Sequence, residues 1–275
     1  MPAFVIDGAR LNVETAGSGP ALVLLHGFTG SARTWHGHLE VFAERYTTVA
    51  PDLLGHGASD APPDPRRYAV AHAVEDTIGI LDRLAIRRAA LLGYSMGGRV
   101  ALATAIAAPE RVAALVLESA SPGLRGHEAR LARAARDAAL AETIERDGLP
   151  AFVEEWERQA IFVTQEDLPG EVRAALRAQR LQNNPTGLAN SLRGFGQGVM
   201  PPMHDFLPAI TAPALIVAGA LDPRYVEIGE AMRNAMPRAR LVVVPRAGHA
   251  VHVEQPETFQ HVVLEFLRET FTVLA

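Results

Sequence analysis

The stretch AALLGYSMGG, residues 89–98, decides the fold. Its apolar run 89–92 predicts a short buried strand, and residues 96–107, which end before a proline, predict a helix. Ser95 falls on the tight turn between them, with glycines at 93 and 97. Glycine avoids the Cβ clashes that arise where a strand and a helix pass closely. We therefore expect the Ser95 hydroxyl to stand clear of the sheet, as a nucleophile on a strand–turn–helix requires.

A glycine-rich turn could instead belong to a nucleotide-binding protein. Such proteins carry a G-x-G-x-x-G or a Walker pattern, because backbone N–H groups must cradle phosphates. Neither pattern occurs in this chain. The nucleophile interpretation is therefore favoured over nucleotide binding.

Outward from this turn, apolar runs of strand length alternate with helix-length stretches. Continuous rather than alternating apolarity is typical of strands covered on both faces, as in a parallel sheet. The sequence therefore predicts an α/β fold with a mostly parallel eight-stranded sheet and helices on both faces. The expected strands are 4–7 and 11–15, which form a hairpin through Gly8, then 21–25, 47–50, 89–92, 112–117, 214–218 and 241–244. Besides the helix at 96–107, one is expected with Val74, Ile78, Leu81 and Ala85 on one face, and a last one at about 258–269.

The alternation of strands and helices stops at Ser121-Pro122-Gly123 and resumes at 211–213. The residues between are rich in alanine, arginine and glutamate, with helical spacing and no clear strand. We expect residues 1–121 and 209–275 to form the sheet core and residues 122–208 to form a helical lid. A length of 275 residues is consistent with one large domain carrying such an insertion.

Composition excludes several function classes. The net charge of −5 argues against a nucleic-acid partner, which usually selects a basic excess. The chain has no cysteine, which excludes thiol nucleophiles, and no lysine, so all 26 basic residues are arginine. No secretory signal, membrane span or metal-ligand spacing is evident, so a cytoplasmic protein without metal or cofactor is expected. The oligomeric state is left open.

A serine needs an adjacent base to act as a nucleophile or a base. His249 follows the expected strand 241–244, and Asp222 follows 214–218, so both lie at carboxyl ends of strands, where ligand chemistry collects. The order Ser95, Asp222, His249 is that of an α/β-hydrolase triad. The Met96 N–H, at a helix start, and the Phe28 N–H, after strand 21–25, are the expected oxyanion-hole donors.

We expect other polar residues near strand ends to have structural roles or to be alternatives to members of the triad. His26 is expected to shape its loop rather than to transfer protons. Asp52 and His56, in the turn DLLGHGAS (residues 52–59), are expected to be structural. Glu118 ends the strand 112–117 and is an alternative acid for the triad.

Taken together, these motifs resemble the α/β-hydrolase superfamily over nearly the whole chain outside 122–208. Three segments, GYSMGGRVAL (93–102), LESASPGL (117–124) and GLANSLRGFGQG (187–198), are similar to a narrower family. The insertion residues 128–182, with the run RDGLPAFVEEW (146–156), resemble that family too. The family is 2-succinyl-6-hydroxy-2,4-cyclohexadiene-1-carboxylate synthase, a lyase of menaquinone biosynthesis.

The resemblance implies a cofactor-independent elimination of pyruvate from an enolpyruvyl cyclohexene that carries three carboxylates. It implies that this small-molecule substrate is held by arginines, while the Ser–His–Asp set abstracts a proton. By motif, the implied substrate-binding residues are Arg99, Arg133, Arg180, Tyr94 and Trp156; Arg130 and Arg136 lie near Arg133 in register. Ala120 and Ser121 depart from some relatives, which carry Gly or His there.

Three alternatives stay open, one to substrate-binding lid arginines and two to a lyase. Lid arginines could simply cover solvated helix faces, since Arg133 with Asp137 and Glu142 with Arg146 have i, i+4 spacing. The enzyme could be a carboxylesterase or a C–C bond hydrolase that forms an acyl-enzyme on Ser95. A non-catalytic binding protein of the same fold is the third possibility.

Overall fold

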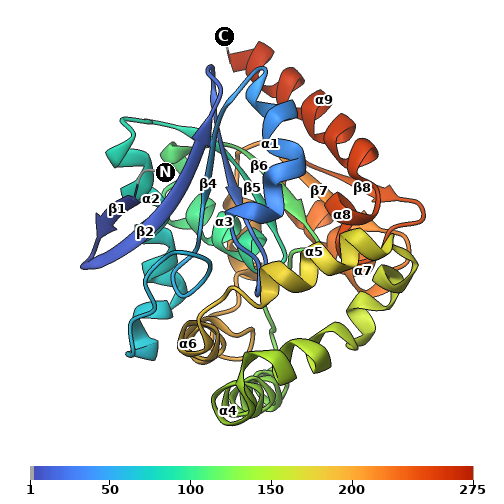
Figure 1. Ribbon diagram of the computed structural model, residues 1–275. Helices are drawn as coiled ribbons and strands as arrows, with labels where there is room; N and C mark the ends of the chain where they lie inside the picture. Colours follow the sequence, from blue (N-terminus) through green and yellow to red (C-terminus); the bar gives the residue numbers. More distant parts are fainter. Residues whose placement is uncertain (1–2, 275) are drawn as a thin grey trace.

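A mostly parallel sheet forms the centre of the protein, which we describe from a computed structural model covering residues 3–274 (Figure 1). The strand order is β1-β2-β4-β3-β5-β6-β7-β8. The strand β2 pairs antiparallel with both β1 and β4, and all neighbours from β4 to β8 pair parallel. The predicted α/β class and eight-stranded sheet are confirmed. The strands are β1 (Ala3–Ile6), β2 (Ala9–Ala16), β3 (Ala21–Leu25), β4 (Thr47–Pro51), β5 (Ala89–Tyr94), β6 (Val112–Glu118), β7 (Ala214–Gly219) and β8 (Ala239–Val244).

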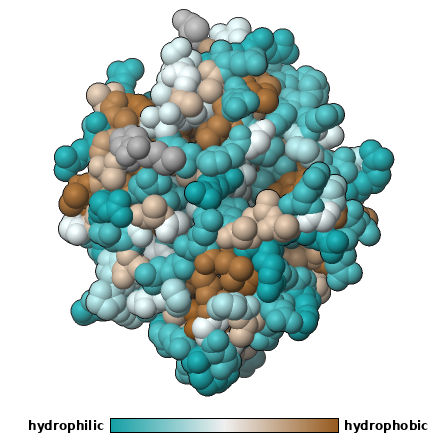
Figure 2. Space-filling model, in the orientation of Figure 1, coloured by the Kyte–Doolittle hydropathy of each residue, from teal (hydrophilic) through white to brown (hydrophobic). Residues whose placement is uncertain are grey.

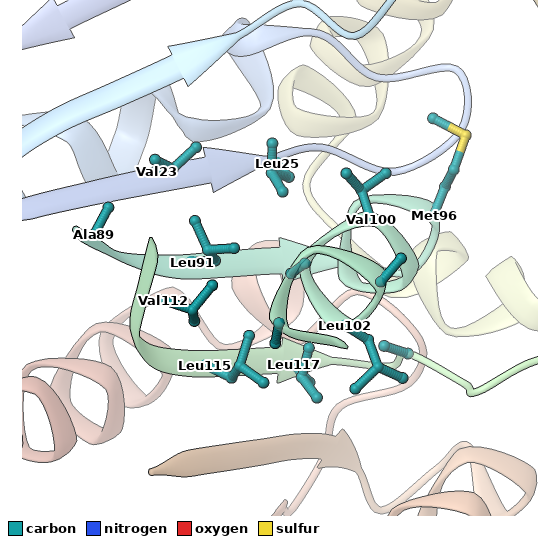
Figure 3. Close-up of a cluster of buried hydrophobic side chains, with 14 of the residues drawn as sticks. Val23, Leu25, Ala89, Leu91, Met96, Val100, Leu102, Val112, Leu115 and Leu117 are labelled. Atoms are coloured by element: carbon teal, nitrogen blue, oxygen red, sulfur yellow. The ribbon is translucent and has the colours of Figure 1, made fainter. Parts of the chain in front are cut away.

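Helices cover both faces of the sheet. Neighbouring residues along each strand point to opposite sides, so a strand that is apolar throughout presents apolar side chains to both layers of helices. In β3, for example, Val23 and Leu25 pack into one buried cluster, and Leu22 and Leu24 pack into the other. The first cluster contains residues of α2 (Val70–Arg83), α3 (Met96–Ala107) and α7 (Pro223–Ala235) and is drawn in part in Figure 3. The second contains residues of α1 (His36–Ala43) and α9 (Pro256–Leu274).

Two sequence expectations about these elements are wrong in detail. Ala85 does not share the apolar face of α2, because the helix ends at Arg83 and Ala85 has a left-handed backbone, φ 54°. This conformation turns the chain toward β5. The strand β8 is not covered on both faces, because it lies at the edge of the sheet, and its Val243 is 41% exposed.

Between β6 and β7 the described chain contains helices and no strand. These are α4 (His127–Glu157), α5 (Gly170–Arg180), α6 (Pro185–Phe195) and two 3₁₀ segments, η4 (Ala160–Asp167) and η5 (His204–Ala209). Gly148, with φ 81°, breaks α4 just before Leu149 and Pro150. Phe152 and Leu188 belong to a separate small core that joins α4 to α6. This segment therefore has apolar packing of its own. Residues 1, 2 and 275 of the expected sheet core lie outside the described residues.

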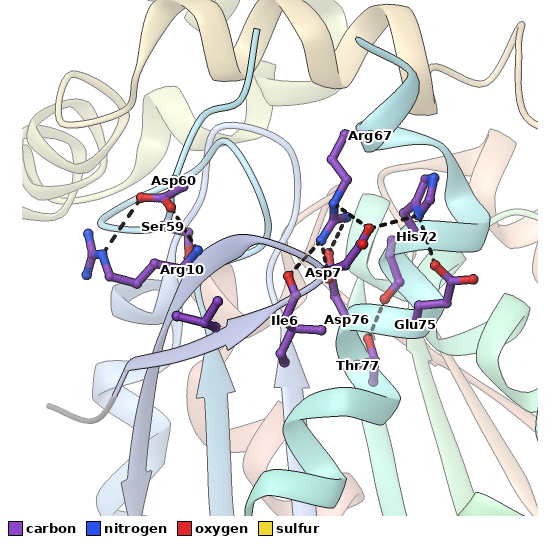
Figure 4. A network of polar contacts seen from close by, with 12 residues as sticks. Ile6, Asp7, Arg10, Ser59, Asp60, Arg67, His72, Glu75, Asp76 and Thr77 are labelled. Carbon is purple, nitrogen blue, oxygen red and sulfur yellow. Dashed lines mark hydrogen bonds and ion pairs between the residues drawn. The ribbon is translucent and has the colours of Figure 1, made fainter. Parts of the chain in front are cut away.

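The β1–β2 hairpin is fastened to α2 by charged groups (Figure 4). The Arg67 guanidinium lies 2.6 Å from an Asp76 carboxylate oxygen and 3.2 Å from one of Asp7. Asp7 also approaches His72 and Glu75, and these three residues form the one trio of possible metal ligands in the described chain. These side chains are partly or fully exposed; His72 contacts both Asp7 and Glu75, and Asp7 also pairs with Arg67, so we interpret the trio as a surface ion-pair network.

The outer surface is mixed in character. Figure 2 shows hydrophobic residues on one face as separate patches among hydrophilic side chains. Among the described helices, none combines the length and apolar composition needed to cross a membrane.

Candidate active site

Ser95 lies on the turn between β5 and α3 in a conformation that few non-glycine residues adopt, with φ 51° and ψ −106°. Its N–H donates to the Glu118 carbonyl oxygen of the neighbouring strand at 2.8 Å. A Cβ on Gly93 would clash with the Gly97 backbone, and a Cβ on Gly97 would clash with the Leu25 carbonyl. The glycines therefore let strand and helix approach closely enough to hold this strained turn.

A hydrogen-bonded chain connects Ser95 to two residues from distant loops. His249, in the loop after β8, has its Nε2 atom 3.1 Å from the Ser95 Oγ atom. Its Nδ1 atom lies 2.8 Å from Asp222 Oδ2. Asp222 caps α7 by accepting from the Tyr225 N–H at 3.3 Å, which fixes its position. With Nδ1–H donated to Asp222, His249 Nε2 can accept the Ser95 proton.

The two expected oxyanion donors lie beside this chain. Met96 is the first residue of α3, and Phe28 lies in the loop after β3, next to Gly27, against which the Tyr94 ring packs. Within residues 3–274, neither the Phe28 N–H nor the Met96 N–H donates a hydrogen bond to a protein acceptor. Both residues line the same cavity as Ser95. The arrangement leaves two backbone donors free for an anionic oxygen.

The cavity above Ser95 has a volume of about 160 Å³ and mixed polarity. The sheet core contributes Ser95, His249 and Tyr225 to its lining. Helices α4 and α6 and the segment η4 contribute most of the remainder, including the aromatic residues Trp156 and Phe162. A ligand in this cavity would therefore lie between the sheet edge and the helical segment 122–208.

Arg99 is a buried cation in this cavity. It lies one helical turn after Ser95 on α3 and is only 8% exposed. Its Nη1 atom donates to the Phe195 carbonyl oxygen at 2.8 Å and contacts Met200 Sδ at 3.2 Å. No carboxylate of the described chain lies within ion-pair distance of it, and burial lowers its pKa to about 10. A buried guanidinium without a carboxylate partner is costly, unless an anion arrives to pair with it.

The structure places the two expected lid arginines differently from each other. Arg133, on α4, lines the cavity but is already bonded, with Nε 2.7 Å from Asp137 Oδ1 and Nη1 3.1 Å from Gln197 Oε1. Arg180, at the end of α5, does not line this cavity. It donates to Glu157 Oε1 at 2.8 Å and to Gln165 at 3.2 Å.

The two expected aromatic residues both line the cavity. Trp156 packs edge-on against Phe28 with ring centroids 5.3 Å apart. Tyr94 lies with its ring centroid 5.5 Å from that of His249. Burial raises the pKa of the Tyr94 hydroxyl well above its ordinary value, so Tyr94 is a neutral hydrogen-bonding group at this wall.

Two arginines of the cavity lining were not assigned to the site from the sequence. Arg136 lies three residues after Arg133 on α4, and Arg224 lies two residues after Asp222 in the first turn of α7. The i, i+3 spacing from Arg133 was a usable signal for Arg136, because such residues share a helix face. For Arg224, the only sequence signal of a place in the cavity was its position two residues after Asp222.

The polar residues expected to be structural hold the loops of the site. Asp52 accepts from the N–H groups of Ala32 and Ala58, at 2.6 and 2.8 Å. His26 Nε2 accepts from the Leu53 N–H at 3.0 Å, which requires a neutral ring. Burial lowers the pKa of His26, and it lowers that of His56 to about 3. These rings are therefore uncharged at neutral pH and fix the loop around Phe28.

Glu118, the alternative acid, has a different partner from the one expected. Its Oε1 accepts from the His252 N–H at 2.9 Å and lies 2.8 Å from His252 Nδ1. Both side chains are fully buried. Glu118 thus orients the short helix α8 (Val251–Glu254) after His249, while Asp222 is the carboxylate bonded to His249 itself.

Comparison with known proteins places this geometry in a family. Residues 20–256 match the family described as alpha/beta hydrolase fold. A Bacillus subtilis strain 168 protein, provisionally named 2-succinyl-6-hydroxy-2,4-cyclohexadiene-1-carboxylate synthase, is 43% identical over 265 residues, 96% of each chain. The synthase of that name from Salmonella paratyphi C strain RKS4594 is 32% identical over 90% of this chain and 94% of its own.

A solved structure agrees with these relatives. The structure of MenH from S. aureus superposes with a TM-score of 0.90 at 35% identity, and covers 94% of this chain and 98% of its own. The match extends through the helical segment between β6 and β7 as well as the sheet, because so little of either chain is left out. The chain therefore belongs to the α/β hydrolase fold family and, within it, to the family of 2-succinyl-6-hydroxy-2,4-cyclohexadiene-1-carboxylate synthases.

Proposed function

We propose that this protein is a lyase that eliminates pyruvate from 2-succinyl-5-enolpyruvyl-6-hydroxy-3-cyclohexene-1-carboxylate. The names of the similar proteins support the reaction. The observation that carries it is Arg99, a buried guanidinium that pairs with no carboxylate of the described residues and lies one turn from Ser95. A neutral ester would need an apolar site here, whereas a substrate with three carboxylates needs fixed cations.

In the proposed mechanism, His249 accepts the Ser95 proton across the 3.1 Å contact. The Ser95 oxygen then removes the ring proton next to the succinyl ketone. The electron pair of that C–H bond forms a new ring double bond, and the existing ring double bond shifts toward the carbon that bears the enolpyruvyl group. The C–O bond at that carbon breaks, and the enolate that leaves becomes pyruvate when its terminal carbon is protonated. Asp222 orients His249 and balances the charge of its protonated form.

Negative charge builds on the succinyl ketone oxygen while the ring proton leaves. We assign its stabilisation to the free N–H groups of Phe28 and Met96, which line the cavity beside Ser95. Donors fixed by the fold need no reorganisation during the reaction, which is why such a site lowers the barrier. Holding the carboxylates in place supplies a further part of the rate enhancement.

We assign residues 122–208 the role of a lid over this site. Support comes from the cavity lining, to which this segment contributes Arg133, Trp156 and Phe162 among others. Arg133 and Trp156 are proposed to contact the substrate, as is Tyr94 from the core. Arg180 would have to leave Glu157 to take the same role.

The alternative is an esterase or C–C hydrolase that forms an acyl-enzyme on Ser95. The deciding experiment compares pyruvate release from the enolpyruvyl substrate with hydrolysis of p-nitrophenyl esters by the same preparation. We expect pyruvate formation and slow ester turnover. Fast ester hydrolysis without pyruvate would overturn the lyase proposal. The proposal also places the protein in the cytoplasm, which cell fractionation would test.

A further inference from the structure

The loop that carries His249 connects the edge strand β8 to the short helix α8. Its residue Arg246 has a left-handed backbone, φ 58°, which is unfavourable for a residue with a Cβ. The Leu221 N–H donates to the Ala247 carbonyl oxygen at 2.8 Å and ties the loop to the segment after β7. A loop on an edge strand with one strained residue needs further bonds to hold an imidazole within reach of Ser95.

Glu254, the last residue of α8, supplies such bonds. Its Oε2 atom accepts from the Gly248 N–H at 2.6 Å, and its Oε1 atom accepts from the Ala250 N–H at 3.3 Å. These two amides belong to the residues directly before and after His249, and all three of these loop residues are buried. Among the described residues, neither N–H donates to another protein acceptor. One carboxylate therefore holds the backbone on both sides of His249.

The helix that carries Glu254 is itself fixed to the sheet. Helix α8 is only four residues long, so its own backbone bonds give it little stability. Glu118, at the end of β6, accepts from the His252 N–H of α8 at 2.9 Å through its side chain. The main-chain carbonyl oxygen of Glu118 accepts from the Ser95 N–H at 2.8 Å. One buried residue thus anchors both the turn of Ser95 and the helix from which Glu254 holds His249.

We propose that Glu254 is a positioning residue that sets the distance and direction of the His249 imidazole toward Ser95. This role rests on the proposed function, because it serves the transfer of the Ser95 proton to His249. Glu254 is not among the described residues that line the cavity, so it acts through the backbone of the loop and not on the substrate. A carboxylate forms charge-assisted bonds to the two amides, which are stronger than bonds to a neutral acceptor.

The first test is steady-state kinetics of pyruvate release by Glu254→Ala and Glu254→Gln. Glu254→Ala removes both acceptors and should lower kcat about 10–30-fold, while KM stays within about twofold because the cavity lining is intact. Glu254→Gln keeps one carbonyl acceptor and should lower kcat only about threefold. Glu257→Ala is the matched control, because Glu257 is exposed in the first turn of α9. A kcat of Glu254→Ala within about twofold of wild type would overturn the inference.

A labelling measurement separates this inference from the proposed function and from a loss of folded protein. A fluorophosphonate reacts rapidly with Ser95 when His249 accepts the hydroxyl proton, whatever the natural substrate. Mass spectrometry gives both the rate and the final extent of labelling. Labelling of Glu254→Ala that is about tenfold slower but reaches the wild-type extent would support the inference, even if the wild type releases no pyruvate and the proposed function fails.

Three results of the labelling would overturn the inference. The first is labelling of Glu254→Ala at the wild-type rate and to the wild-type extent. The second is a lower final extent at an unchanged rate, which would show that Glu254 only keeps the chain folded. The third is a wild type that the fluorophosphonate does not label, because there would then be no working relay for Glu254 to position.

Discussion

The guanidinium of Arg99 stacks on the ring of Phe195, with its central carbon 4.6 Å from the ring centroid, and also donates to the Phe195 carbonyl oxygen. These contacts come from α3 and from the last residue of α6, so a residue of the helical segment holds the cation in place. The aromatic face and one carbonyl oxygen engage the group without neutralising it. Its remaining N–H groups stay available to an anion.

Replacement of this cation should therefore damage catalysis. We expect Arg99→Ala to lower kcat/KM for pyruvate release by about 10²-fold, on the order of 1.5–3 kcal/mol, because a charge-assisted contact is lost. Arg99→Lys should recover only part of this, since an ammonium cannot reproduce the fork. Thermal unfolding of each variant checks that the fold persists. Unchanged kinetics in a folded Arg99→Ala protein would mean that the residue only supports Phe195.

Removal of the Ser95 hydroxyl should separate catalysis from binding. Ser95→Ala deletes the proposed proton-abstracting oxygen, while Arg99 and the rest of the cavity lining remain. Turnover should fall at least about 10³-fold. Affinity for the substrate, measured by calorimetry with the inactive variant, should change by less than about threefold. Turnover near that of the wild type would refute the assigned role of Ser95.

Buried neutral histidines predict a loss of stability in mild acid. Burial lowers the pKa of His38 and of His56 to about 3, against an ordinary value of about 6.5. Below pH 6.5 the rings of His38 and His56 therefore bind protons in the unfolded chain but stay neutral in the folded chain. As the pH is lowered from 6.5, the free energy of unfolding should decrease by up to about 1.4 kcal/mol per pH unit for each ring. The decrease should stop near pH 3, where His38 and His56 take up protons in the folded chain as well.

Urea denaturation at pH 7.5, 6 and 5 measures this slope. His56→Asn should lose the contribution of one ring and show a shallower pH dependence. His127→Asn is the control, because His127 is exposed at the start of α4. An identical slope in His56→Asn and the wild type would show that His56 takes up a proton as readily in the folded chain as in the unfolded chain.

Two glycines should respond oppositely to alanine. A Cβ on Gly97 would clash with the backbone carbonyls of Leu25 and His26, so Gly97→Ala should cost about 3 kcal/mol or more. A Cβ on Gly37, in α1, would meet nothing within 4 Å. Gly37→Ala should therefore raise the free energy of unfolding by about 0.5–1 kcal/mol. Urea midpoints of the two variants compare these effects, and equal midpoints would contradict both expectations.

Much of the sheet was predictable because its signals are local. A run such as 21–25 is apolar at every position, and the structure buries all five residues. The turn at Ser95 was equally predictable, because its glycines and the following helix are adjacent to Ser95 in the sequence. The half-exposure of β8 was not predictable in this way, because strand order depends on packing between distant segments.

In the site, too, residues at strand ends were predictable from the sequence, and residues of the helical segment were not. Ser95, Asp222 and His249 each follow a strand, so parallel strands bring them to one edge of the sheet. The structure places His249 within hydrogen-bonding distance of both Ser95 and Asp222. No comparable rule predicts which side chains of the helical segment reach the site. Whether an arginine on α4 or α5 faces the cavity or a neighbouring glutamate depends on how helices pack, and Arg180 bonds to Glu157, 23 residues earlier in the chain.

The buried guanidinium of Arg99 also bears on how the protein is handled. Citrate and phosphate are multivalent anions of the kind that a guanidinium binds, so they should occupy the cavity during purification or assay. Purification in phosphate followed by assay in the same solution would then report a competitively inhibited enzyme. A monovalent buffer at moderate chloride, which screens exposed charges without bridging them, would reveal its full turnover.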